Sequence, residues 1–537
     1  MSDQFKWWQK GIVYQIYPRS FQDSNADGIG DLPGIIDKLD YLNDGTENSL
    51  GVDAIWISPF YKSPMKDFGY DVADYCDIDP MFGTLDDFDR LVTEAHKRGI
   101  KIIIDWVPNH TSDQHAWFLE SRSSRDNPKH DWYIWRDPKP DGSRPNNWGS
   151  IFGGPAWEWD EARQQYYYHM FVKEQPDLNW ANPAVYSAMT DVLHFWLKRG
   201  VDGFRMDVVY LIHKADGMPD NPIDPNADPN LPENDIFSRQ IHLYDGAQPE
   251  VHKYMRRFRE ITDQYGDTTI VGEIWEDDLA KWTSYYGPED DELQLPFNFR
   301  LMQLKEWNAS VVRRSVEDLE GALPEFAWPN YVLGNHDRKR PASRVGSQAQ
   351  ARVAQMLLLT LRGTPTLYQG DELGMEEASI PPEQWVDPWG INLGITRDGC
   401  RTPMQWDDSR YAGFSTVPPW LPVQDDSIWR NVTDMSKDPR SFFTLVRRLI
   451  HLRRATPALN VGEYRALGSA PEGVYAYIRA HGAERVLVAL NFTAERQVMI
   501  LPDSGTLLIN THLDRDGELT GGTLELRPDE GVVIALA

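Results

Sequence analysis

The sequence predicts an α/β protein built on a closed barrel of eight parallel strands, followed by a small antiparallel β domain. Three observations support this fold class. β-rich segments alternate with segments of helical periodicity, the β-rich segments count to eight, and beyond about residue 460 the apolar periodicity changes to two. Repeated strand–helix units predict a parallel sheet, and eight of them close into a (β/α)8 barrel. Period two predicts strands with one buried face.

The eight strand candidates are short apolar runs rich in β-branched residues. They are 11–18, 52–59, 101–107, 201–207, 268–274, 295–301, 329–335 and 363–369. Two of the helices between them have clear boundaries. Residues 85–98 follow a possible N-cap, Thr84, and stop at Gly99, whereas residues 184–199 follow Asn182-Pro183 and stop at Gly200. A third helical pattern, 441–454, precedes the change of period.

Irregular stretches interrupt the barrel pattern, and the chain of 537 residues exceeds one ordinary domain. The connection 111–177 is rich in Trp, Gly and Pro, and a loop of that size is normally functional or a subdomain. We therefore divide the chain into 1–110 (barrel), 111–177 (insertion), 178–459 (barrel, with a second irregular insertion at about 375–435) and 460–537. The last unit should be an antiparallel β-sandwich, with strands at 473–478, 485–491, 497–501 and 531–537.

The charge balance excludes polyanionic partners. With 82 acidic and 54 basic residues the formal net charge is −28 and the pI is about 4.8, whereas nucleic-acid binding requires a basic surface. A neutral substrate fits better. The 21 Trp residues suit stacking on sugar faces, although the alternative is that most are packing aromatics.

The termini and cysteines indicate a cytoplasmic protein. Residues 1–10 have no apolar core typical of a signal peptide, and no uninterrupted apolar run of about 18 residues occurs, so no membrane partner is expected. Cys76 and Cys400 are too few for a disulfide framework and should be free thiols.

Three acids, Asp207, Glu273 and Asp337, each follow a predicted strand and so lie at one end of the barrel. For any single acid the alternative is a solvated loop residue. Arg205 precedes Asp207 by two positions, so both should project to one face, where the guanidinium would keep the carboxylate ionised. Glu273 follows an apolar run that should raise its pKa toward that of a general acid. A pair of acids with these properties is what a retaining glycosidase needs.

Four segments in this order resemble the signature regions of the α-amylase superfamily, glycoside hydrolase family thirteen. They are 105–110, 202–207, the segment at Glu273 and 335–337, with Trp106 departing from the family's usual aliphatic residue. The resemblance implies that Asp207 is the nucleophile, Glu273 the acid/base and Asp337 the transition-state stabiliser. It also implies that 111–177 is domain B, which overhangs the active site.

Two further segments resemble a subgroup of that family. Residues 166–179 are similar to oligo-1,6-glucosidases and α-glucosidases, and 397–406 to exo-acting α-glucosidases. The resemblance implies that Arg401 pairs with Asp67 to grip the terminal glucose, a structural salt bridge being the alternative. It also implies substrate contacts or support of the acids by Tyr70, His110, Phe152, Phe171, Gln175, Arg205 and His336.

A possible metal loop lies near the N-terminus. Residues 23–28 place oxygen-bearing side chains at alternate positions with glycine at the sixth, as in the first part of an EF-hand loop, but Gly34 stands where the twelfth-position glutamate belongs. Oligo-1,6-glucosidases bind calcium in a similar loop without that glutamate. The resemblance implies a structural calcium or magnesium ion held by Asp23, Asn25, Asp27, Asp31 and the Ile29 carbonyl, and an Asx-turn loop without metal is the alternative.

The expected function is that of a retaining α-glucosidase, without organic cofactor, releasing glucose from the non-reducing end of a small oligosaccharide or disaccharide. Val208, directly after the nucleophile, favours α-1,6 linkages, while the segments 208–211 and 295–299 leave α-1,4 and α,α-1,1 linkages open. The alternatives are a transglucosylase or isomerase on the same scaffold, such as trehalose synthase or sucrose isomerase. A non-catalytic transporter ectodomain would carry a membrane segment and commonly lack acids of the triad.

Overall fold

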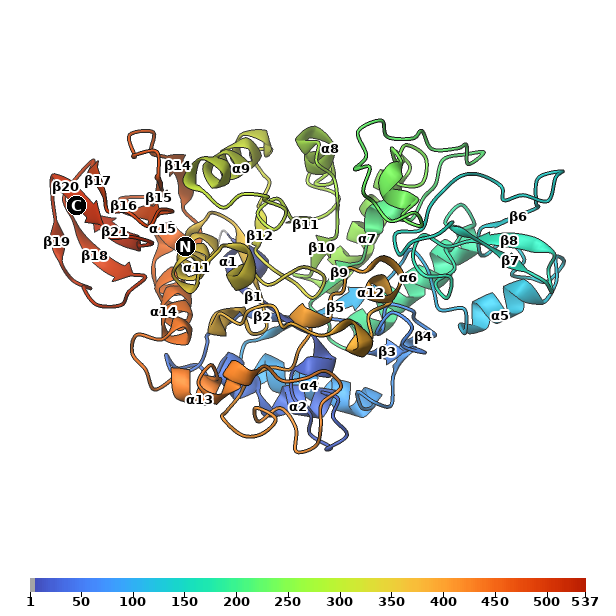
Figure 1. The fold of residues 1–537 in the computed structure, drawn as a ribbon, viewed down its shortest axis with the longest axis horizontal. Helices are drawn as coiled ribbons and strands as arrows, with labels where there is room; N and C mark the ends of the chain where they lie inside the picture. Colours follow the sequence, from blue (N-terminus) through green and yellow to red (C-terminus); the bar gives the residue numbers. More distant parts are fainter. Residues whose placement is uncertain (1–4) are drawn as a thin grey trace.

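The computed structural model describes residues 5–537, so the first four residues of the unit predicted at 1–110 lie outside it. At its centre eight parallel strands close into a barrel in the order β1-β13-β12-β11-β10-β9-β5-β2 (Figure 1). The strands are β1 (Val13–Ile16), β2 (Ala54–Ile57), β5 (Lys101–Trp106), β9 (Gly203–Met206), β10 (Thr269–Gly272), β11 (Leu295–Asn298), β12 (Asn330–Val332) and β13 (Thr364–Tyr368). Each lies within a predicted strand, so the predicted fold class is confirmed.

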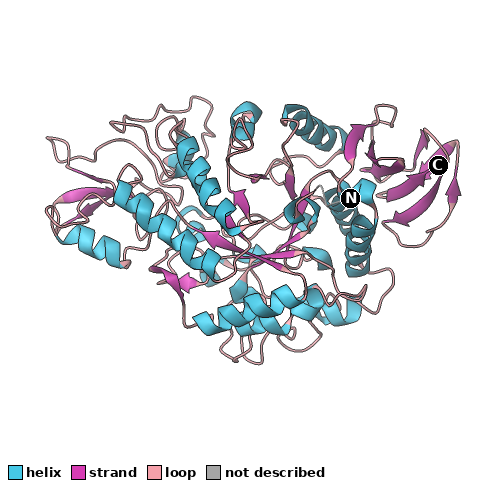
Figure 2. Ribbon diagram, turned by 180° about the vertical axis from the view of Figure 1, so that it is seen from behind, coloured by secondary structure: helices cyan, strands magenta, loops and turns pink. Residues whose placement is uncertain are grey.

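Helices surround the barrel and connect its strands (Figure 2). The main ones are α2 (Leu32–Asp37), α4 (Leu85–Lys97), α6 (Pro183–Lys198), α7 (Val251–Thr262), α8 (Leu279–Ser284), α9 (Ala309–Ala322), α11 (Gln348–Thr360) and α14 (Phe442–Ala455). The predicted cap Thr84 is present at the start of α4, and the side chains of Asn182 and Ser441 likewise accept backbone N–H groups at the starts of α6 and α14.

Apolar side chains fill the barrel. Those from its strands, together with Trp8 from α1 (Trp7–Lys10), form one cluster that includes Val13, Ala54, Trp56, Ile103, Val271, Leu295, Phe297 and Val332. The helices pack against the outer face of the strands through a second, larger cluster. Residues that follow the strands, such as Asp207 after β9 and Glu273 after β10, therefore gather at the carboxyl end of a rigid sheet.

Two irregular additions lie near that end. Between β5 and α6 the chain forms α5 (Ala116–Ser123) and a three-stranded antiparallel sheet of β6 (Trp135–Arg136), β8 (Gln165–Tyr168) and β7 (Trp157–Asp160), at the right of Figure 1. The stretch after β13 contains only short helices, among them α12 (Pro388–Leu393) and α13 (Val432–Met435). A third long connection, from β9 to α7, was not singled out from the sequence, and in residues 212–250 it contains a single short 3-10 helix.

The C-terminal part is an antiparallel β-sandwich, as predicted. One sheet runs in the order β14 (Glu463–Ala466), β15 (Val474–His481), β16 (Glu484–Asn491), β21 (Gly531–Leu536), β18 (Gly505–Asn510) and β19 (Leu519–Thr520). The second pairs β17 (Gln497–Ile500) with β20 (Thr523–Leu526). Met499 and Leu524 of the small sheet share an apolar cluster with Leu487 and Val532 of the large one. Four of these strands, β14, β18, β19 and β20, were not predicted. Across residues 5–537 no helix combines the length and apolar character needed to cross a membrane.

Candidate active site

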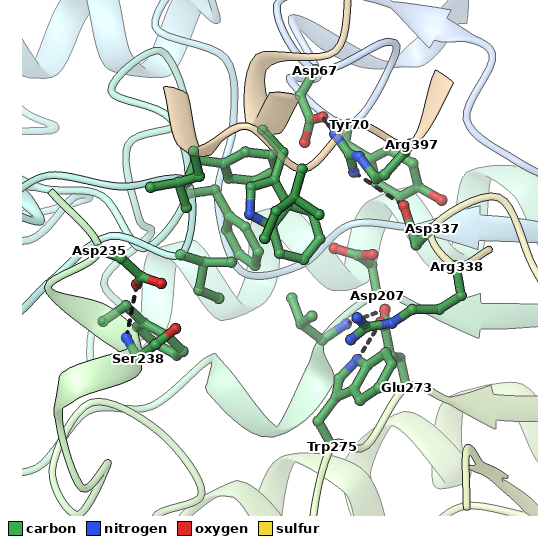
Figure 3. A pocket seen from close by; sticks show the side chains of 18 of the residues that line it. Asp67, Tyr70, Asp207, Asp235, Ser238, Glu273, Trp275, Asp337, Arg338 and Arg397 are labelled. Carbon is green, nitrogen blue, oxygen red and sulfur yellow. Dashed lines mark hydrogen bonds and ion pairs between the residues drawn. The ribbon is translucent and has the colours of Figure 1, made fainter. Parts of the chain in front are cut away.

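A cavity of about 430 Å3 opens where the barrel strands end (Figure 3). The barrel, the β5–α6 insertion, the β9–α7 connection and the stretch after β13 all contribute to its wall. The lining residues are Asp67, Tyr70, His110, Ile151, Phe152, Phe171, Asp207, Val208, Tyr210, Leu231, Asp235, Phe237, Ser238, Glu273, Trp275, Asp337, Arg338, Trp389, Leu393, Ile395 and Arg397. The three predicted catalytic acids are all among them.

Arg205 holds three carboxylates together beneath the cavity. Its Nη1 donates to Asp207 Oδ1 at 2.7 Å and to Asp105 Oδ1 at 2.6 Å, and its Nη2 donates to Glu273 Oε2. The predicted contact between Arg205 and Asp207 is therefore confirmed. Because a single buried cation faces three acids, the site cannot hold all three ionised without cost.

The pKa values of two of these acids reflect the excess of negative over positive charge. Burial raises the pKa of Asp207 well above its usual value, and the nearby Glu273 adds to the rise while Arg205 opposes it. Burial likewise raises the pKa of Asp105 to about 6 despite Arg205. Burial therefore outweighs the expected effect of Arg205, and the Asp207 carboxyl favours its neutral form more than an exposed aspartate does.

The expected apolar setting of Glu273 is not found. Besides Arg205, its carboxylate accepts the indole N–H of Trp275 at 2.7 Å and the backbone N–H of Val208 at 3.2 Å. The apolar residues before Glu273 pack elsewhere, Val271 inside the barrel and Ile270 against the helices, whereas the carboxylate itself lies among donors at the strand end. In this conformation the Glu273 carboxylate accepts hydrogen bonds from three donors.

Val208 has a backbone conformation that β-branched residues rarely adopt. Its φ of 33° and ψ of 39° lie in the left-handed region, directly after Asp207. Such strain persists only where the surroundings impose it, and it is common at functional sites. Here the turn directs the Val208 N–H toward Glu273 and places the side chain in the cavity wall.

Asp337 lies in a positive environment. Arg397 Nη1 is 3.0 Å and Arg401 Nη2 is 2.9 Å from its Oδ1. Burial favours the neutral acid, but the contact with His336 and the charges of the two arginines outweigh it and hold the pKa of Asp337 far below its usual value. Burial lowers the pKa of the adjacent His336 to about 3, so that ring is neutral at physiological pH. Asp337 is thus a permanent anion in the wall of the cavity.

The predicted pairing of Arg401 with Asp67 is wrong, because Arg397 takes that place. Arg397 Nη2 lies 2.8 Å from Asp67 Oδ1 and is fixed from behind by Asp387 at 2.6 Å. Arg401 instead points toward the barrel, where its Nε donates to the His336 carbonyl at 2.7 Å. The two arginines meet only through Asp337, which both of them contact.

The remaining predicted site residues either line the cavity or lie behind its wall. Asp67, Tyr70, His110, Phe152 and Phe171 line the cavity with the three acids. Gln175, Arg205, His336 and Arg401 lie behind it, and each bonds to a lining residue. Gln175 contacts Asp67 and His110, and His336 contacts the Tyr70 hydroxyl at 2.7 Å. These four groups therefore position the wall.

Several wall residues were missed from the sequence. Trp275, Arg338 and Arg397 each lie within four residues of a predicted site residue, so proximity to the motifs was the available signal. Trp389, Leu393, Ile395, Leu231, Asp235, Phe237 and Ser238 come from long connections without periodicity, which carried no such signal.

In the predicted metal loop the carboxylate side chains accept hydrogen bonds from nearby backbone N–H groups. Asp23 Oδ1 accepts the N–H of Ala26 at 2.7 Å, Asp27 Oδ1 accepts that of Ile29 at 2.8 Å, and Asp31 caps α2 through Gly34 at 2.6 Å. Such bonds are typical of Asx turns and stabilise the loop without a metal. Among the residues from 5 onward, no three His, Cys, Asp or Glu side chains are grouped so that they could hold an ion. Calcium or magnesium stays a prediction.

Comparison with known proteins agrees with the barrel and its acids. Residues 15–462 match the family described as alpha amylase, catalytic domain, and residues 474–533 match the SusG C-terminal domain of alpha-amylases. The chain belongs to the alpha-amylase family. As an alpha-amylase-family glycoside hydrolase it is an enzyme.

Relatives of this family member are named as glucosidases. A probable alpha-glucosidase of Rhizobium meliloti is 42% identical over 92% of this chain and 91% of its own length. An oligo-1,6-glucosidase of Heyndrickxia coagulans is 41% identical over 99% of both chains. Among solved structures, the alpha-glucosyl transfer enzyme XgtA superposes with a TM-score of 0.92 at 42% identity, covering 99% of this chain and 100% of its own. The trehalulose synthase MutB gives 0.89 at 37% identity, covering 99% and 100%.

Proposed function

We propose that this glycoside hydrolase is a retaining, exo-acting α-glucosidase that removes glucose from the non-reducing end of short α-1,6- and α-1,4-glucosides. The observation that carries the proposal is the closed end of the cavity. Asp67, Arg397 and Asp337 form a continuous ion-pair cluster there, backed by Asp387. A sugar bound against this cluster has no room for a further residue beyond it, which restricts cleavage to the terminal unit.

The spacing of the acids supports retention of configuration. Asp207 and Glu273 contact the two neighbouring terminal nitrogens of one guanidinium. Inverting enzymes separate their carboxyl groups by about 6.5–9.5 Å to admit a water, whereas retaining enzymes hold them about 5–5.5 Å apart. Two acids that share Arg205 fit the closer arrangement.

In the proposed reaction Asp207 attacks the anomeric carbon as the bond to the leaving oxygen breaks. Glu273 gives its proton to that oxygen, and a glucosyl ester on Asp207 remains. Glu273 then takes a proton from the water that cleaves the ester. Asp337 and the Asp67–Arg397 pair bind hydroxyls of the ring. For this reaction Asp207 has to be ionised and Glu273 protonated, and the contact of Arg205 with Asp207 stabilises the attacking charge.

A second candidate is transfer of the glucosyl group to a sugar or another alcohol. The outer wall of the cavity is largely apolar, with Phe237, Trp389, Leu393 and Ile395 among its residues. Such walls disfavour water relative to a packed acceptor at the ester stage. The similarity to a glucosyl transfer enzyme and to a trehalulose synthase is compatible with this candidate.

Product analysis tests both candidates. We expect maltose and isomaltose to yield glucose, with the α-anomer appearing first by NMR. Sucrose, trehalose and nigerose extend the panel to other linkages. Release of β-glucose first would contradict retention, and internal oligosaccharides from starch would contradict exo action. Isomerised sucrose or longer oligosaccharides as the dominant products would instead support transfer.

A further inference from the structure

Two arginines, Arg338 and Arg397, lie in the cavity wall. Arg338 directly follows the ionised Asp337 in the chain, yet, unlike Arg397, it forms no ion pair with a carboxylate. Arg397 in the wall pairs with three acids, and the supporting Arg205 with three. In residues 5–537 no acid lies within ion-pair distance of the Arg338 guanidinium, and its buried Nε has no hydrogen-bond partner. A half-buried cation that is left unpaired is costly, and a bound group that accepts its hydrogen bonds would offset that cost.

Aromatic contacts fix the direction of this side chain. Its guanidinium carbon lies 4.6 Å from the ring centre of Trp275 and 5.9 Å from that of Trp389. Trp275 is in turn stacked on Phe299 at 4.2 Å with nearly parallel planes. The guanidinium therefore lies beside two indole rings in the wall of the cavity.

The position of Arg338 relative to the acids indicates which part of a substrate it meets. Figure 3 shows Arg338 and Trp275 on the side of Asp207 opposite to Asp67 and Arg397. Trp275 is bonded to Glu273, the acid that protonates the leaving oxygen in the proposed function. A leaving group starts at that oxygen and extends away from the closed end, which brings it against Arg338.

Resting on the proposed function, we propose that Arg338 is a specificity-determining residue that binds hydroxyl groups of the leaving sugar. Most other side chains around this part of the cavity are apolar, including Phe237, Trp389, Leu393 and Ile395. The N–H donors of a guanidinium in an otherwise apolar wall favour a leaving group with several hydroxyl groups over a leaving group without hydroxyls.

Steady-state kinetics of Arg338→Gln tests this assignment on leaving groups with and without hydroxyls. For maltose and isomaltose we expect kcat/KM to fall about tenfold or more. For 4-nitrophenyl α-glucoside, whose leaving group has no hydroxyl, the change should stay within about twofold to threefold. The inhibition constant of 1-deoxynojirimycin, which occupies the glucose end, should not change. Arg338→Lys keeps the charge without the fork and should recover part of the disaccharide activity.

A matched control is Lys339→Gln, which removes the neighbouring exposed positive charge and should leave every value unchanged. Equal losses on the aryl glucoside and the disaccharides would overturn the proposal, because they would show that Arg338 acts through Glu273 or the fold. Unchanged disaccharide kinetics would overturn it as well. If the wild type hydrolysed none of these substrates, the proposed function itself would fail, a result distinct from any effect of the substitution.

Discussion

Arg397 and Asp67 form a buried ion pair with 2.8 Å between Nη2 and Oδ1, and this pair closes one end of the cavity. The Arg397 guanidinium also forms ion pairs with Asp387 and Asp337, which help to hold its orientation. Asp67 comes from the loop after β3 (Tyr61–Lys62) and Arg397 from the stretch after β13, so two long connections meet at this point. The proposed exo action depends on this junction between loops.

The pair predicts a loss of substrate affinity in Asp67→Asn. The substitution keeps the size of the side chain but leaves Arg397 without one of its compensating charges and the terminal glucose without an anionic acceptor. We expect kcat/KM for maltose to fall about 30-fold to 1,000-fold, which corresponds to a loss of ~2–4 kcal/mol of transition-state stabilisation. Steady-state kinetics checks this value. Efficient release of internal oligosaccharides from starch by the wild type would contradict the closed geometry.

The two acids predict different outcomes when they are neutralised separately. Asp207→Asn should abolish turnover without unfolding the protein, because an amide cannot supply the attacking charge. Glu273→Gln should lose least activity on an activated aryl glucoside, whose leaving group needs no proton. Circular dichroism controls for folding. Wild-type rates on maltose and isomaltose in either variant would refute the assignment of roles.

The barrel could be predicted because its signals are local. Each strand is a short apolar run, helices such as α4 and α6 begin at capping residues, and the strand–helix alternation counts to eight. The positions of the three acids were predicted from the same pattern, because each acid lies at the end of a predicted strand. Arg205 was placed correctly because residues two apart on a strand share a face.

The loops could not be predicted in the same way. Arg397 and Arg401 are four positions apart in a stretch with no periodicity, so nothing local decides which of them reaches Asp67. The environment of Glu273 was misjudged for a related reason. The residues before it indicate the strand, but its partners Arg205 and Val208 come from β9 and the turn after it and meet Glu273 only in the fold, while Trp275 lies two positions further along the chain.

The loop at 23–31 predicts a measurable effect of chelation if it holds a metal. A cation bound only by the native protein raises its stability by mass action, so chelator should lower the melting temperature and added calcium or magnesium should restore it. Asp27→Ala should reproduce the effect of chelator and make the variant insensitive to it. If wild type and variant melt identically with and without chelator, the loop is the Asx-turn structure alone.

His115 predicts a loss of stability in acid. Burial lowers its pKa to about 4, and its Nδ1 accepts the Trp117 N–H at 3.1 Å, so the folded protein needs the neutral ring. The unfolded chain takes up a proton below about pH 6.5, whereas the native protein does so only near pH 4. The stabilising contribution is therefore complete above pH 6.5 and is lost as the pH falls toward 4.

His115→Asn isolates this contribution, because asparagine caps a helix equally well and does not titrate. Between pH 7 and pH 5 the wild type should lose about 2 kcal/mol more unfolding free energy than the variant. Urea unfolding of both proteins at the two pH values measures the difference. Parallel pH dependence would show that His115 keeps an ordinary pKa in the fold.

Val208 predicts a shift in linkage preference. Its side chain lies in the cavity wall directly after Asp207, on a left-handed turn that also directs its N–H to Glu273. Replacing it with Thr keeps the β-branching, so the backbone strain stays nearly the same while a hydroxyl is added at almost constant volume. That hydroxyl can bond to the leaving sugar of an α-1,4-glucoside. We therefore expect Val208→Thr to raise the maltose-to-isomaltose ratio of kcat/KM several-fold, about 1 kcal/mol of discrimination. An unchanged ratio, with both rates intact, would place linkage selection in the outer loops and leave Val208 with a role in the turn alone.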